Sequence, residues 1–129
     1  MVKHIGKAFA AFAVVLMVTS APLAAHHSAA AEFDVTKEIT LTGVLTKFEL
    51  VNPHTWFYVD VTGPDGRVTS WRLEGLSPNG LIRQGLKMRD DFKLGGTYTF
   101  RIAPARKEPA LGFLKAVTVN GKEYVVVEL

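Results

Sequence analysis

The residues best suited to chemistry in this chain are its histidines. Three of the four, His26, His27 and His54, follow a short N-terminal leader, and the chain contains no cysteine. An N-terminal histidine can offer its α-amine and its Nδ1 to one metal ion. A second imidazole would complete a nitrogen-rich, planar donor set suited to Cu(II). The pattern therefore predicts copper as the cofactor, held by His26, His27 and His54.

The leader has the three parts of a secretory signal peptide. Lys3 and Lys7 precede eleven uninterrupted apolar residues, and a run of small residues then leads to Ala25. The apolar run is shorter than the roughly 20 residues that cross a bilayer. We expect residues 1–25 to be removed on export, which leaves 104 residues in the periplasm or medium. No later segment is long or apolar enough to span a membrane.

The exact cleavage point changes the form of the copper chelate. Cleavage after Ala25 makes His26 the first residue, as described above. Cleavage after Ala24 places His27 third, where an amine, two amides and an imidazole can enclose Cu(II) in a square plane. The alternative is that the two histidines merely follow the cleavage site in an arm, residues 26–37, that binds nothing.

The position of His54 raises a geometric difficulty for a three-histidine site. His54 follows the first predicted strand, whereas the arm precedes that strand. Simple topology therefore predicts that the arm and His54 lie at opposite ends of the domain. The arm spans up to roughly 40 Å when extended, so it can reach His54 only by lying along the domain.

A second candidate site surrounds His54 and needs no metal. Asn52 and Pro53 favour a turn, and Trp56 and Tyr58 then share the face of a strand opposite Phe57. Outer strands and loops of small barrels bind extended ligands such as oligosaccharides. Asn52, Trp56 and Tyr58 are therefore candidates for binding a small molecule, a glycan or an envelope protein. The alternative is that the arm or a helix covers this face.

Composition and motifs argue against two other classes of function. Removing the leader lowers the 15 basic side chains to 13, against 12 acidic ones, so the net charge falls to +1 and gives no electrostatic basis for binding nucleic acid. The chain has no Gly-rich phosphate loop, nucleophile elbow or His-Glu-x-x-His motif. We therefore expect a binding protein without catalytic residues.

The elements that must position these residues are short strands. The order of three strands, one short helix and three more strands predicts a mostly-β domain over residues 38–129, a small antiparallel OB-like barrel with the helix between its third and fourth strands. An open β-sandwich is the alternative. The apolar pattern changes phase at Gly43, which predicts a β-bulge or a bend there. The predicted strands are residues 39–50, 55–61, 68–74, 98–103, 113–119 and 124–127, and the predicted helix starts after Ser77 and ends at Gly85.

Several motifs together resemble one family of exported bacterial proteins. The most specific are the Ala-His-His-Ser sequence at the end of the leader and Asn52-Pro53-His54. The others are Ala31-Glu32-Phe33-Asp34, Leu41-Thr42-Gly43-Val44, Trp71-Arg72-Leu73-Glu74 and Ser77-Pro78-Asn79-Gly80-Leu81. The chain thus resembles domain-of-unknown-function family 6152 over nearly all of its mature length. The resemblance implies a small periplasmic β-rich domain and brings no established activity, cofactor or catalytic residue. The chain departs from the pattern at Ala29, where a bulky residue is expected.

Overall fold

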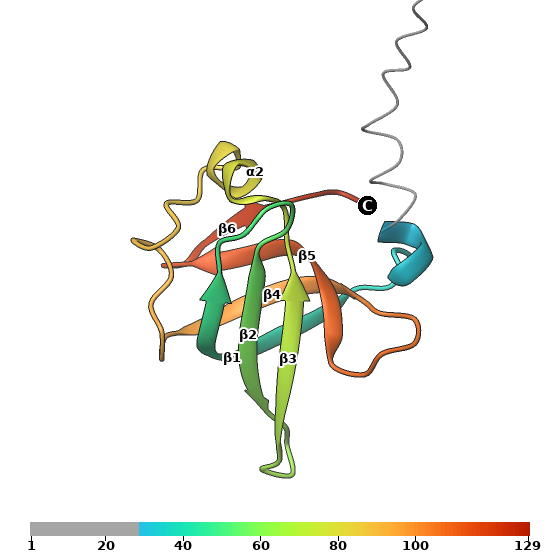
Figure 1. Cartoon of the computed structure of the whole chain (residues 1–129). Helices are drawn as coiled ribbons and strands as arrows, with labels where there is room; N and C mark the ends of the chain where they lie inside the picture. The colour runs from blue at the N-terminus through green and yellow to red at the C-terminus, as the bar shows by residue number, and fades with distance from the viewer. Residues whose placement is uncertain (1–28) are drawn as a thin grey trace, which may run out of the picture.

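The computed structural model describes residues 29–129, which form one small barrel (Figure 1). The predicted leader, its cleavage point, and His26 and His27 lie outside the described residues. None of the helices within the described part is long and apolar enough to cross a membrane. The elements in chain order are β1 (Ile39–Glu49), β2 (Trp56–Thr62), β3 (Val68–Glu74), α2 (Pro78–Arg83), β4 (Thr97–Pro104), β5 (Leu111–Val119) and β6 (Lys122–Val125).

The strands close into a barrel with the topology of an OB-fold. Hydrogen-bonded neighbours follow the order β3-β2-β1-β4-β5-β6, and an additional pairing of β3 with β5 closes the ring. The helix α2 lies between β3 and β4 in the chain, as predicted. This closure confirms the OB-like barrel and excludes the open sandwich. The β3–β5 pairing is parallel, so the barrel is mixed and not wholly antiparallel.

Because the sheet closes into a barrel, the pairing register is shifted along β1 by one circuit of the barrel. A sheet that closes into a barrel needs tilted strands and a staggered register. A path of paired residues leads from Glu49 on β1 once around the barrel and returns to β1 at Ile39, about ten residues earlier. The path runs through Trp56, Glu74, Phe113, Ala103 and its neighbour Ile102. The residues that pair with the start of β1 and the residues that pair with its end therefore lie close together on the same rim of the barrel.

The barrel interior is filled by aromatic and aliphatic side chains. Phe57 is fully buried, and its ring lies 5.0 Å from that of Phe92 and 6.0 Å from that of Phe100, measured between centroids. The helix α2 adds Leu81, which is also fully buried. The apolar side chain of its neighbour Ile82 is not buried with it and is 52% exposed. Leu81 and Ile82 are adjacent, and a helix of only six residues turns too few positions toward the barrel to bury both side chains.

The predicted β-bulge at Gly43 is wrong. The pairing of β1 with β2 shifts between Leu45 and Lys47, two residues further on. Leu45 is buried and Val44 is 38% exposed, so the first half of β1 keeps one phase through Gly43. The glycine is needed for another reason. A Cβ at Gly43 would lie 2.4 Å from the backbone oxygen of Asp60, so the two strands leave no space for a side chain.

Candidate metal site at the His54 end of the barrel

The segment before β1 is attached to the rim of the barrel. Residues 29–32 form a helical turn, and Phe33 then pairs with Ala105 in an isolated bridge just beyond β4. The amide of Asp34 donates to the carbonyl of Pro104 at 2.8 Å, and the amide of Arg106 donates to the carbonyl of Glu32 at 2.9 Å. Two backbone hydrogen bonds therefore fix the segment on either side of Phe33.

The side chain of Phe33 anchors this segment in a second apolar cluster. It is 1% exposed, and its ring centroid lies 5.4 Å from that of Phe113 on β5. Trp56, the first residue of β2, packs against the same cluster. The buried members are Phe33, Ala103, Leu111 and Phe113.

The arm and His54 therefore lie at the same end of the barrel. Trp56 is two residues beyond His54 and belongs to the cluster that holds Phe33. This corrects the prediction that the arm and His54 occupy opposite ends. The physical reason is the staggered register of the closed barrel. It brings the start of β1 close to the start of β2, the strand that follows β1 in the chain.

The loop between β1 and β2 positions His54 through its neighbour Thr55. Thr55 is fully buried; its amide donates to the carbonyl of Leu76 at 3.0 Å, and its carbonyl accepts from the amide of Gly75 at 2.8 Å. These bonds continue the β2–β3 ladder beyond the Trp56–Glu74 pair. His54 therefore leaves the barrel directly beside the end of β3. The peptide bond between Asn52 and Pro53, just before it, is cis.

The imidazole of His54 is oriented through its Nδ1 atom. Nδ1 lies 2.9 Å from Oε1 of Glu74 and 3.1 Å from the carbonyl oxygen of Gly75. A carbonyl oxygen can only accept, so these partners assign the proton of a neutral ring to Nδ1. Within residues 29–129, Nε2 takes part in no hydrogen bond, and the side chain is 40% exposed. Nε2 is thus the ring nitrogen left for an external ligand.

The carboxylate closest to His54 belongs to Glu74. The side chain of Glu74 is less exposed than that of His54. The Glu74 side chain is 13% exposed, and burial raises the pKa of this carboxyl above its ordinary value. The nearby imidazole of His54 acts in the opposite direction, while the negative charge of Glu32 raises the pKa of Glu74 further. Glu32 on the helical turn and Glu74 on β3 are therefore close enough for their charges to interact.

The part of the chain that the structure describes does not hold a complete metal site. Among residues 29–129, no group of three or more histidine, aspartate or glutamate side chains is arranged to hold a metal ion. His54 and Glu74 form a pair only.

The predicted aromatic face of β2 is partly occupied by protein contacts. Trp56 and Tyr58 are both half-buried. The Tyr58 hydroxyl donates to Oε2 of Glu49 at 3.2 Å, and the Lys47 ammonium lies 5.0 Å from the centroid of its ring. Asn52 is exposed. The structure therefore brings Trp56 and His54 together at the rim, while Tyr58 has partners of its own further along the strand.

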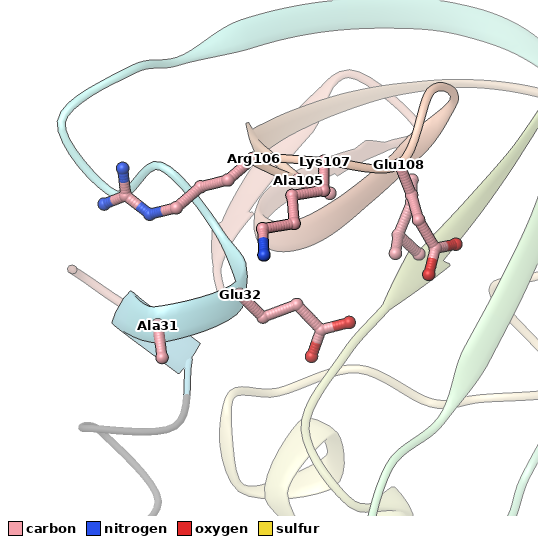
Figure 2. A pocket seen from close by; sticks show the side chains of 7 residues that line it. Ala31, Glu32, Ala105, Arg106, Lys107 and Glu108 are labelled. Carbon is pink, nitrogen blue, oxygen red and sulfur yellow. The ribbon is translucent and has the colours of Figure 1, made fainter.

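A cavity of about 260 Å³ lies between the helical turn and the β4–β5 loop (Figure 2). The side chains of Glu32, Lys107 and Glu108 extend into the same hollow. Arg106 also lines the cavity, and its Nε donates to the carbonyl of Ala30 at 3.2 Å. Glu108 is already paired with Arg72 at 2.7 Å. Because its charges are mixed and partly paired, the cavity shows no preference for an anion.

Sequence reasoning missed two residues of this end, Glu74 and Phe33. Glu74 is the last residue of a predicted strand, and nothing in its neighbours signals contact with a histidine twenty residues earlier. Phe33 did carry a signal, because it is the one large apolar side chain in an otherwise small and polar segment. A lone aromatic residue in such a segment often marks a docking point.

Comparisons with known proteins identify a family and find similarity to a solved structure. The model of a family of unknown function, DUF6152, matches residues 13–114 and confirms the resemblance seen in the sequence motifs. No curated protein matches the chain. Among solved structures, the chain is similar to the mitochondrial single-stranded DNA binding protein Rim1 of S. cerevisiae. The identity is 7%, the TM-score is 0.48, and the match covers 65% of this chain and 93% of that one.

Proposed function

We propose a function for this chain, which belongs to the DUF6152 family of unknown function: it is an exported binding protein that holds Cu(II) between its processed N-terminus and His54. His26 supplies its α-amine and imidazole, His54 supplies Nε2, and His27 supplies a further nitrogen. The protein sequesters, delivers or senses the metal and needs no catalytic residue for any of these roles.

The observation that carries the proposal is the docking of the N-terminal segment beside His54. Phe33 fixes the segment in the cluster that also contains Trp56. His26 lies three residues before Ala29 in the chain, and three residues span at most about 10 Å. The short distance along the chain supports a site in which the N-terminal histidines and His54 bind one ion.

The donor chemistry supports copper over other metals. Imidazole and amine nitrogens suit Cu(II), and a site of this kind takes tetragonal geometry. The only sulfur of the predicted mature chain belongs to Met88, which is 7% exposed within the main core and cannot serve as a ligand at the rim.

The test is a Cu(II) titration of protein exported and processed by a bacterial host. Mass spectrometry first identifies the N-terminal residue. The matched variant carries one additional residue before the processed N-terminus, which leaves the barrel unchanged and removes the α-amine from His26. We expect tight one-to-one binding by the processed chain and at least a tenfold weaker affinity in the extended one, because the six-membered amine–imidazole chelate is lost.

Weak or non-stoichiometric binding by the processed chain would contradict the proposal. The metal-free alternative would then apply, in which a small molecule, glycan or envelope protein binds near Trp56 and Tyr58. Under that alternative, Trp56→Ala lowers ligand binding and added copper changes nothing.

A further inference from the structure

We infer that Glu74 is a positioning residue for metal binding by His54: its carboxylate accepts the Nδ1–H hydrogen bond and so presents Nε2 to the ion. This inference rests on the proposed copper function and adds a residue that supplies no donor of its own. It assigns a role to the closest charged contact of His54, at 2.9 Å.

The arrangement matches the way proteins orient metal-binding histidines. Such a histidine nearly always donates its second ring N–H to a carboxylate or a backbone carbonyl, which fixes the tautomer and raises the basicity of the other nitrogen. His54 has both kinds of acceptor, Oε1 of Glu74 and the carbonyl oxygen of Gly75 at 3.1 Å. The ring is therefore held in the form that binds a metal before any metal arrives.

The backbone around Glu74 is rigid enough to perform this role. Glu74 is the last residue of β3 and pairs with Trp56 of β2 on one side and with Phe113 of β5 on the other. It therefore belongs to the strand pairing that closes the barrel, and its side chain is only 13% exposed. A carboxylate on such a support can fix an imidazole that itself projects from a loop.

The other carboxylates at this end are not placed to do the same. Glu32 is exposed on the helical turn, and it influences Glu74 through its charge. Glu108 is paired with Arg72. Neither makes a hydrogen bond to His54 among the described residues. Glu32 therefore provides a control for the effect of charge alone.

The experiment compares Glu74→Ala and Glu74→Gln with Glu32→Gln in the full exported chain. Cu(II) affinity is measured by competition with a chelator, and the remote nitrogen of the bound imidazole is observed by electron spin-echo envelope modulation. Thermal melts confirm that each variant folds. The neutral variants should fold, because burial disfavours the charged form of Glu74.

We expect Glu74→Ala to lower copper affinity by about 10- to 100-fold, the usual cost of losing such a supporting carboxylate. Glu74→Gln retains an acceptor oxygen and should lose less. Both should shift the remote-nitrogen signal, since its quadrupole coupling reports the Nδ1–H hydrogen bond. Glu32→Gln should leave that signal unchanged.

Wild-type affinity and an unshifted signal in Glu74→Ala would overturn the positioning role while leaving the copper site intact. An affinity loss of equal size in Glu32→Gln and Glu74→Gln, with no spectral change, would also overturn it, because charge alone would then explain the effect. Failure of the proposed function looks different: the wild-type chain itself would not bind copper.

Discussion

Replacing His54 with alanine is expected to lower the affinity for Cu(II) by at least about 100-fold. Loss of a residue that only supports a metal ligand costs about 10- to 100-fold, and loss of the ligand itself should cost no less. His54 is 40% exposed in a loop, so its removal should hardly change folding stability. The affinity is measured by chelator competition on the processed protein, with a thermal melt alongside.

The control for this variant is Tyr58→Phe. It removes one hydroxyl, which donates to Glu49 on the neighbouring strand β1 and makes no hydrogen bond with His54 within residues 29–129. Copper affinity should stay at the wild-type value in this control. If His54→Ala also binds as the wild type does, the N-terminal chelate alone holds the metal and the barrel takes no part.

Replacing Phe33 with alanine is expected to detach the N-terminal segment from the barrel. The side chain is 1% exposed and packs on Phe113. Truncation of a buried phenylalanine costs about 3–5 kcal/mol, and we expect the lower end, about 3 kcal/mol, because a segment near the chain end can detach without leaving a closed cavity. Denaturant unfolding measures the loss. Hydrogen exchange should show faster exchange at the amides of Asp34 and Arg106, which bond across this contact.

The same variant also tests whether docking supports the metal site. If Phe33 holds the histidines near His54, then Phe33→Ala weakens copper binding in addition to lowering stability. Leu94→Ala is the matched control, because Leu94 is 63% exposed and should change neither quantity. Unchanged exchange at Asp34 in Phe33→Ala would contradict the docking account.

Much of the fold could be predicted because its turns are encoded locally. Ser77 caps α2, accepting the amide of Gly80 at 3.1 Å, and Pro78 begins the helix. Asn120 and Gly121 both have positive φ, as the hairpin turn between β5 and β6 requires. These signals divide the chain into the correct order of strands and helix. The closed barrel follows from that order.

Features that depend on contacts between distant strands could not be read from the chain. The phase change in β1 was visible as a pattern, but a glycine is a common place for a bulge, and the actual shift lies near Lys47. Gly43 is required by the approach of β2, which only the assembled sheet reveals. The stagger that brings the N-terminal segment beside His54 is likewise a property of the closed barrel.

The candidate site was predictable only in part for the same reason. An imidazole at residue 54 after Asn-Pro is visible in the sequence. Its partner Glu74 is twenty residues away and meets it only because β2 and β3 pair with Trp56 opposite Glu74. The tautomer that leaves Nε2 available depends on that contact and on the carbonyl of Gly75.

The most direct test is a crystal structure of the processed protein loaded with one equivalent of Cu(II), with diffraction data collected at the copper absorption edge. The account predicts one strong anomalous peak, bonded to His54 Nε2 and to the amine and imidazole of the N-terminal histidine, with Glu74 still in contact with His54 Nδ1. A peak away from His54, or no ordered copper at this end of the barrel, would contradict it.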